Sequence, residues 1–271
     1  MPKKLIDLDL APEEVPKIWS LMPKRTIKLL ERLLGVHEVN KSYDRFIADT
    51  SDCHLATKLS RAFSFQFEVE TENFFIPETG PLIVIANHAY LPVDGIVVTS
   101  MLSRFRADGR ALVNVFFKHV LGSQKISIFA SPLRSVYGQR LNSVAVRLCE
   151  RHLMRKKSLF LFPSGQVSTL SWRTFRQEER SWRTTVAFLA RKTNAAVLPV
   201  FIEGSHSLLF QIVFLINPRL ANLLLLREVI RAKRCLLKLK VGEILSADSF
   251  ERYKTDEELT NFFREQLYSL R

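Results

Sequence analysis

The apolar residues of this chain change their spacing near residue 80. Before that point the pattern is helical. In TIKLLERLLG, residues 26–35, one isoleucine and four leucines recur at helical spacing, and the lysine and arginine fall on the other face. Gly35 is placed to end this helix. We therefore expect residues 1–75 to form a helical N-terminal segment that packs on the core or lies against a membrane.

After residue 80, short apolar runs alternate with stretches of helical periodicity. The runs predict strands at 82–86, 112–117, 159–162, 196–202 and 237–241. Helices are predicted at 141–154 and 182–193, and a last one begins at a capping box formed by Thr255 and Glu258. This alternation predicts an α/β fold with buried strands.

One apolar stretch, residues 208–226, is about 20 residues long, which is enough to span a bilayer. Asn217, Pro218 and Arg219 interrupt it. We expect two short apolar helices here, either buried in the core or dipping into one leaflet of a membrane.

The composition fits one large domain, since 47% of the 271 residues are hydrophobic and no repeat or Gly/Ser linker divides the chain. The net charge of +13 is concentrated: residues 101–200 carry 18 Lys and Arg against 4 Asp and Glu. Such a region attracts an anionic membrane surface, an acidic carrier protein, a phosphate-bearing substrate or nucleic acid, or it is only a solvated basic face. Charge alone does not choose among these.

The cysteines point to a reducing compartment. Cys53, Cys149 and Cys235 are odd in number and far apart, and they form no CxxC pair, so neither a disulfide framework nor a zinc site is indicated. The first twenty residues mix acids into every window and lack the apolar core of a secretory signal.

Two strand ends carry candidate chemistry. The strand at 82–86 runs into NHAYLPVDG, which places Asn87 and His88 at its end and Asp94 six residues after His88. A histidine oriented by a carboxylate is a general base near neutral pH, although metal binding or a local turn hydrogen bond would use the same pair. The strand at 159–162 runs into the turn FPSG, residues 162–165.

The absence of several common motifs argues against particular classes of enzyme. The sequence has no GxSxG, HExxH, GxxxxGK[ST] or GxGxxG, which argues against serine hydrolases of the elbow type, zincins and nucleotide-binding proteins. Ser164 lacks the leading glycine of a nucleophile elbow. A His–Asp pair without a protein nucleophile suggests that the base activates a substrate hydroxyl directly.

The segments NHAYLPVDG, FPSGQVS and AVLPVFIEG follow one another as the blocks of the glycerolipid acyltransferase superfamily do, which are NHxxxxD, FPEGTRS and VPV. The chain resembles most the haemolysin-like and lyso-ornithine-lipid acyltransferase branch, in which the His-to-Asp interval is one residue longer and FPxGxVS replaces FPEGTRS. The resemblance covers residues 20–245. It implies a mixed, largely parallel sheet flanked by helices, with residues 76–271 as the acyltransferase domain.

The resemblance also implies roles for individual residues. His88 corresponds to the catalytic histidine and Asp94 to its supporting acid. The acceptor-binding block, which offers backbone N–H groups near Gly165 to the polar head, consists of Phe162, Pro163, Ser164 and Gly165, and we add the neighbouring Asn87 to the substrate-binding residues. The usual Glu and Arg of this block are replaced by Ser164 and Val167. The second block of the superfamily is not clear, and Lys118 and Arg140 are its basic candidates.

The activity implied is direct acyl transfer, in which His88 takes the proton of a lyso-lipid hydroxyl that attacks an acyl thioester. No metal and no cofactor are expected. The donor is an acyl-carrier protein, which would dock on the basic region, or acyl-CoA. We expect a lyso-aminolipid such as lyso-ornithine lipid as acceptor, and a peripheral or monotopic enzyme on the membrane surface at the cytoplasmic face of the inner membrane.

Two alternatives stay open. One is a 1-acylglycerol-3-phosphate acyltransferase, and the other is a non-enzymatic basic protein that binds lipid or nucleic acid. We do not expect a nucleic-acid partner, because the sequence lacks an RNP-like or helix-turn-helix signature.

Overall fold

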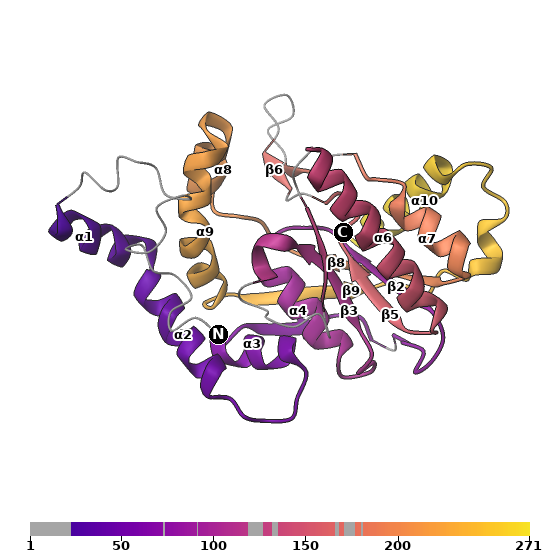
Figure 1. The fold of residues 1–271 in the computed structure, drawn as a ribbon, viewed down its shortest axis with the longest axis horizontal. Helices are drawn as coiled ribbons and strands as arrows, with labels where there is room; N and C mark the ends of the chain where they lie inside the picture. The colour runs from indigo at the N-terminus through magenta and orange to yellow at the C-terminus, as the bar shows by residue number, and fades with distance from the viewer. Residues whose placement is uncertain are drawn as a thin grey trace.

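A seven-stranded sheet forms the centre of the protein (Figure 1). The computed structural model describes residues 23–72, 74–90, 92–118, 127–131, 135–165, 168–170, 177–179 and 181–271. The strand order is β1-β9-β8-β2-β5-β3-β4. The strands are β1 (Gln66–Val69), β2 (Leu82–Ala86), β3 (Arg110–Asn114), β4 (Ser127–Ala130), β5 (Ser158–Leu161), β8 (Ala196–Ile202) and β9 (Leu236–Val241).

Neighbouring strands run parallel except β8 and β9, which are antiparallel. The prediction of a mixed, largely parallel sheet is therefore confirmed. All five residues of β2 are buried, as expected for a strand with neighbours on both sides and helices on both faces. The carboxyl ends of β2, β3, β4, β5 and β8 lie along one edge of the sheet.

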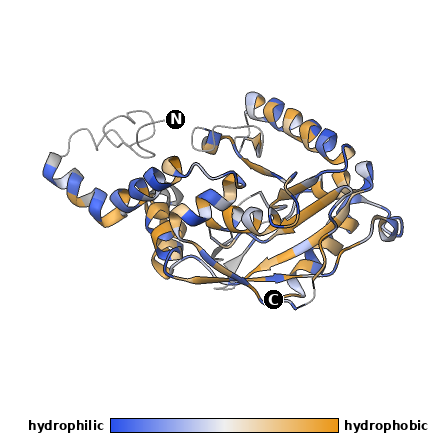
Figure 2. Cartoon of the chain, turned by 90° about the horizontal axis from the view of Figure 1, so that it is seen from below, coloured by the Kyte–Doolittle hydropathy of each residue, from blue (hydrophilic) through white to orange (hydrophobic). Residues whose placement is uncertain are grey.

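Helices cover both faces of this sheet. The helices are α1 (Lys24–Leu34), α2 (Val36–Ala48), α3 (Leu55–Phe63), α4 (Val93–Leu102), α6 (Val136–Met154), α7 (Thr185–Thr193), α8 (Leu208–Ile216), α9 (Pro218–Ala232) and α10 (Asp256–Tyr268), with 3₁₀ turns η2 (Val115–Phe117) and η3 (Ala247–Phe250). Of these, α1 and α8 pack on α9 rather than on the sheet. Successive residues of β2 point to opposite faces: Val84 packs with α2, α3, α4 and α9, whereas Ile83 packs with α6, α7 and α10. Figure 2 shows the sheet as largely hydrophobic and the helices as two-sided.

The N-terminal segment is helical only in part. Helix α1 ends at Gly35, whose φ is 77°, as its sequence predicts. Helices α2 and α3 pack on the core of the sheet. Residues 66–69, which we expected to be helical, form β1 and pair with β9. In QFEV the apolar Phe67 and Val69 are half-buried while the alternate polar residues are exposed, and this two-residue period suits an edge strand. The domain boundary after residue 75 stays a prediction.

The other predicted elements differ from the observed ones mainly at their ends. The strand predicted at 112–117 was wrong beyond Asn114, where the chain turns into η2. Strand β4 and the small antiparallel pair β6 (Thr169–Leu170) and β7 (Gln177–Glu178) were not anticipated. The stretch 208–226 divides at Asn217 into α8 and α9, as predicted. None of the helices in the described ranges is long and apolar enough to cross a membrane.

Candidate active site

The two motifs meet at the carboxyl edge of the sheet. Strands β2 and β5 pair in parallel with Ile85 opposite Leu161, so the residues that follow each strand emerge side by side. The His88 ring stacks on the Phe162 ring with centroids 3.8 Å apart and planes 11° from parallel. Phe162 therefore covers one face of the imidazole and limits its rotation.

Asp94 orients the imidazole of His88. Its Oδ2 lies 2.7 Å from His88 Nδ1, and the carboxylate also accepts the N–H groups of Tyr90 and Gly95, each at 2.9 Å. Asp94 lies in the first turn of α4 and is fully buried. Because both backbone groups are donors, the carboxylate acts as an acceptor, and the contact fits a hydrogen on Nδ1. Nε2 is then the ring nitrogen that can accept a proton.

Asn87 joins the ends of two neighbouring strands. Its Nδ2 donates to the Ile202 carbonyl at 2.9 Å, and its Oδ1 accepts the Ile202 N–H at 2.7 Å. Both polar atoms of the side chain thus hold β8 beside β2. This pairing gives Asn87 a structural role, and its role in substrate binding stays a prediction.

The FPSG turn is closed by its own backbone. Gly165 has a φ of 60°, which favours glycine, and its N–H donates to the Phe162 carbonyl at 3.0 Å. The Pro163 carbonyl accepts the Arg183 N–H at 3.1 Å. We expected N–H groups near Gly165 to face the substrate head. The turn itself uses the N–H of Gly165, and the role of neighbouring N–H groups stays a prediction.

Sequence reasoning missed a buried carboxylate at the centre of this site. Glu179 Oε1 accepts the His88 N–H at 2.7 Å and lies 3.5 Å from Ser164 Oγ, and Glu179 Oε2 accepts Trp182 Nε1–H at 2.7 Å. The one available signal was compositional: Glu178 and Glu179 are the only acids among residues 151–200, which contain ten Lys and Arg.

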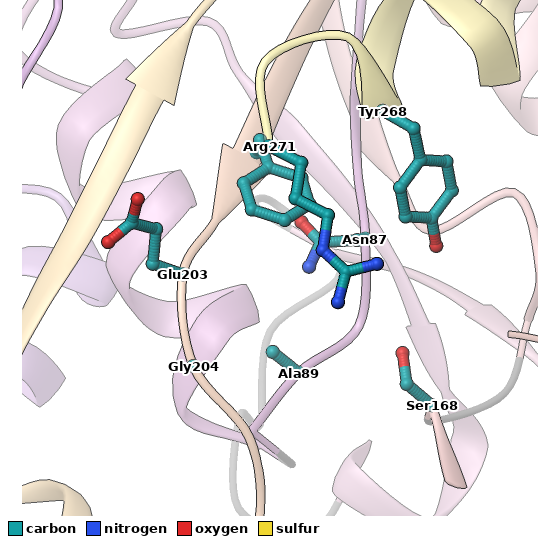
Figure 3. A pocket seen from close by; sticks show the side chains of 8 residues that line it. Asn87, Ala89, Ser168, Glu203, Gly204, Tyr268 and Arg271 are labelled. Atoms are coloured by element: carbon teal, nitrogen blue, oxygen red, sulfur yellow. The ribbon is translucent and has the colours of Figure 1, made fainter. Parts of the chain in front are cut away.

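A cavity of about 300 Å³ lies beside this centre (Figure 3). Asn87 and Ser168 line it together with Glu203, which follows β8, and with Tyr268 and Arg271 from the end of the chain. Burial raises the pKa of Tyr268, and the adjacent Glu179 carboxylate raises it further. The cavity offers both polar and charged groups next to the His–Asp pair, and the sequence had given no indication of Tyr268 or Arg271.

The remaining predicted residues are exposed, buried or outside the described ranges. Lys118 is exposed just after η2, and Arg140 is exposed on α6. Both follow strands that end at the site edge, and their binding role stays a prediction. Ser164 is buried beside Glu179, and Val167 lies outside the described residues. Within the described ranges, no three His, Cys, Asp or Glu side chains gather where they could share a metal ion.

Comparisons with known proteins agree with this architecture. A comparison with curated proteins finds no match. Among solved structures, the chain is similar to the 1-acyl-sn-glycerophosphate (LPA) acyltransferase PlsC from Thermotoga maritima, with 16% identity and a TM-score of 0.51 over 94% of this chain and 85% of that one. That likeness shows a shared fold. A family model described as Acyltransferase matches residues 66–203, from β1 past the end of β8. Since this match spans half of the sequence and includes both motifs, the chain belongs to the Acyltransferase family.

Proposed function

We propose that this acyltransferase moves a fatty acyl group from an acyl thioester to the hydroxyl of a lyso-lipid, with a lyso-aminolipid such as lyso-ornithine lipid as acceptor. The observation that carries the proposal is the His88–Asp94 pair at 2.7 Å, placed at the sheet edge against the FPSG turn. A histidine oriented by a buried carboxylate suits direct attack by a substrate hydroxyl.

The mechanism follows from the orientation of the ring. His88 Nε2 takes the proton of the acceptor hydroxyl as its oxygen attacks the thioester carbonyl. The carbon–sulfur bond then breaks, and the thiolate leaves with the proton that His88 returns. Asp94 holds Nδ1–H and stabilises the imidazolium that forms in between.

The choice of an aminolipid acceptor is supported by residues of the acceptor block. Ser164 and Val167 stand where phosphate-binding relatives of the resemblance carry Glu and Arg, and an arginine fork binds two phosphate oxygens at once. The buried Glu179 carboxylate beside Ser164 adds a negative charge that disfavours a phosphate and suits an amine.

A specific observation favours lysophosphatidic acid as the second candidate. Arg183 lies beside the turn, with its Nε 4.0 Å from the position that a Cβ on Gly165 would take. Its guanidinium is exposed and could bind a phosphate in place of the missing arginine fork. The protein similar in fold is described as an acyltransferase of this phosphate-bearing class.

We propose an acyl-carrier protein as donor, ahead of acyl-CoA, because α6 presents a basic face. Arg147 and Arg151 are exposed one turn apart, and Val144 and Leu148 are exposed between and beside them. A basic helix with apolar contacts suits an acidic protein surface, whereas a nucleotide needs only a few cations.

We further propose peripheral binding to the cytoplasmic face of the inner membrane. Leu29 and Leu33 on α1 are 57% and 65% exposed, and Leu208 and Ile216 on α8 are both 74% exposed. Both helices pack against α9, and Figure 1 shows the three together at one end of the molecule. Exposed apolar side chains gathered on neighbouring helices are typical of a surface that contacts lipid.

The acceptor is tested by competition. Lyso-ornithine lipid and lysophosphatidic acid are supplied together with an acylated carrier protein, and both products are quantified. We expect a several-fold preference for the aminolipid. A several-fold preference for lysophosphatidic acid that falls in an Arg183→Gln variant would establish the second candidate instead.

A further inference from the structure

Glu179 is a buried carboxylate whose oxygens have separate partners. It follows β7 and is 7% exposed. Oε1 takes the backbone N–H of His88, whereas Oε2 takes the indole N–H of Trp182, and the Tyr268 hydroxyl is also hydrogen-bonded to this carboxylate. Burying a charge is costly unless donors surround it, so these three contacts explain why the carboxylate can remain here.

The backbone of His88 lies past the last paired residue of β2. The pairing of β2 with β5 ends at Ile85, and its pairing with β8 ends at Ala86. His88 is held instead by two residues that follow the FPSG turn: Glu179 accepts its N–H, and Ser168 donates its N–H to the His88 carbonyl at 2.9 Å. These two bonds replace the ladder bonds that a longer strand would have supplied.

We propose that Glu179 is a positioning residue for acyl transfer: it fixes the backbone of His88 while Asp94 fixes the ring. The proposal rests on the proposed role of His88 as the base. With the ring held by Asp94 and Phe162 and the backbone held by Glu179, Nε2 keeps one position relative to the cavity. The rate of acyl transfer depends steeply on this position, since a misplacement of about 1 Å lowers a catalysed rate roughly a hundredfold.

A glutamine at position 179 replaces two equivalent acceptor oxygens by one acceptor and one donor. Glutamine has one acceptor oxygen and one NH₂ group, so it cannot accept both the His88 N–H and the Trp182 N–H. Each oxygen faces one donor that cannot also accept, the His88 N–H at Oε1 and the Trp182 indole N–H at Oε2, whereas the Ser164 and Tyr268 hydroxyls can donate or accept. Because the two N–H groups compete for one amide oxygen, we expect the substitution to weaken the hydrogen bond that holds the His88 backbone.

Glu179→Gln should therefore lower kcat about ten- to a hundredfold, the loss typical of a hydrogen bond to a charged group, with KM for donor and acceptor within about twofold. Asp108→Asn is the matched structural control, because Asp108 is a carboxylate that accepts Arg106 and Ser158 at the opposite end of the sheet. We expect it to lower the melting temperature while kcat stays unchanged. An unchanged kcat in Glu179→Gln, or an equal loss in both variants, would overturn the proposal.

A second substitution tests the cause. Trp182→Phe removes the indole donor, so in the double variant with Glu179→Gln the amide nitrogen can take the place of Oε2, and the amide oxygen can take the place of Oε1 and accept the His88 N–H. We expect kcat to recover several-fold over Glu179→Gln alone. Failure to recover would assign the loss to the missing charge and contradict the positioning role.

The hydrogen bond can also be observed without turnover. The chain has 6 histidines, so selective ¹⁵N-histidine labelling gives few backbone amide signals, and His88 is assigned by its loss in His88→Gln. Glu179→Gln should move the His88 amide proton upfield. If this shift occurs and the wild-type protein transfers no acyl group, the proposed function fails while the Glu179 contact stands. No shift would overturn the contact itself.

Discussion

At the scale of single residues, His88 is held by contacts from three segments of the chain. Asp94 fixes the ring through Nδ1, Phe162 covers one ring face, and Glu179 takes the backbone N–H. The contacts come from the first turn of α4 and from the segments that follow β5 and β7, so the position of the proposed base depends on several elements at the sheet edge. His88 is itself buried, and its removal would leave the buried Asp94 carboxylate without its ring partner, so it should lower stability as well as activity.

His88→Ala should lower the turnover of acyl transfer by about 10²- to 10⁴-fold, because a general base contributes that much. The melting temperature should fall as well, because the buried Asp94 carboxylate loses its ring partner, but the protein should stay folded at the assay temperature. Turnover and thermal unfolding are measured on the same preparations. A folded His88→Ala protein with wild-type turnover would exclude His88 as the base.

Asp94→Asn should also impair turnover, by at least about 100-fold. The amide offers one acceptor oxygen to a site with three donors, namely His88 Nδ1–H and two backbone N–H groups. It therefore releases the ring or turns it to the other tautomer. Circular dichroism checks the fold, and a variant that keeps full activity would show that the carboxylate is dispensable.

A second buried carboxylate makes stability depend on pH. Burial alone would raise the pKa of Glu228, but the His206 ring, 3.4 Å away, and hydrogen bonds from Ser207 outweigh it and lower the pKa from 4.5 to about 2. The group thus stabilises the fold above pH 4.5, and this contribution is lost as the pH falls from 4.5 toward 2.

Glu228→Gln should lower the free energy of unfolding at pH 7 by an amount on the order of 3 kcal/mol, as the shift implies. Denaturant unfolding of both proteins at pH 7, 4 and 2.5 measures the difference. We expect the gap between them to shrink steadily with acid. A gap that stays constant across this range would mean that Glu228 does not titrate as described.

The sequence identified the residues of the site that lie in motifs and missed those that do not. His88, Asp94 and the FPSG turn follow buried strands, whose patterns locate them at one edge. Glu179 lies in a stretch without apolar periodicity, and Tyr268 reaches the cavity only because α10 packs across the sheet. Contacts made by tertiary packing leave no local signal in the sequence.

At the scale of elements, the hydrophobic pattern predicted strands best where the strand is completely buried. Strands β2 and β8 were predicted at their observed bounds because their central positions are wholly apolar. Strands β1 and β4 are four residues long and lie at the two edges of the sheet, so each has fewer buried positions to mark it. The break at Asn217 was read correctly because polar and proline residues interrupt an otherwise apolar run.

Helix α6 is the element that we expect to distinguish the two donors. Arg147→Glu with Arg151→Glu reverses two exposed charges one turn apart and should raise KM for an acylated carrier protein about tenfold or more, whereas KM for acyl-CoA should change little. Lys41→Glu with Arg45→Glu on α2 has the same spacing and charge change and serves as control. Equal effects on both donors, or equal effects of both pairs, would remove α6 as the docking surface.

At the scale of the whole molecule, the apolar surface and the basic charge lie on different elements. The exposed apolar residues of α1 and α8 lie around α9, while the excess of basic residues is in 101–200. The sequence had indicated residues 26–34 and the stretch 208–226 as possible membrane contacts, and the structure shows that Leu208 and Ile216 of α8 are exposed. Exposure could not be predicted because a short apolar helix has the same sequence whether it is buried or not.

This separation predicts two components of membrane binding. Attraction of basic residues to an anionic surface contributes about 1 kcal/mol each and is screened by salt, whereas burial of leucine and isoleucine is not. Sedimentation with vesicles containing anionic lipid should show tighter binding than with neutral vesicles. Part of this binding should persist at about 1 M salt, where the Debye length is only about 3 Å.

Leu208→Ser with Ile216→Ser on α8 should weaken this salt-resistant binding roughly tenfold for each residue, because full burial of such a side chain stabilises by about 1.5–3 kcal/mol. Phe188→Ser on α7, also exposed at 40%, should leave it unchanged. Binding that salt abolishes completely, or that the α8 variant retains in full, would show that α8 does not enter the lipid surface.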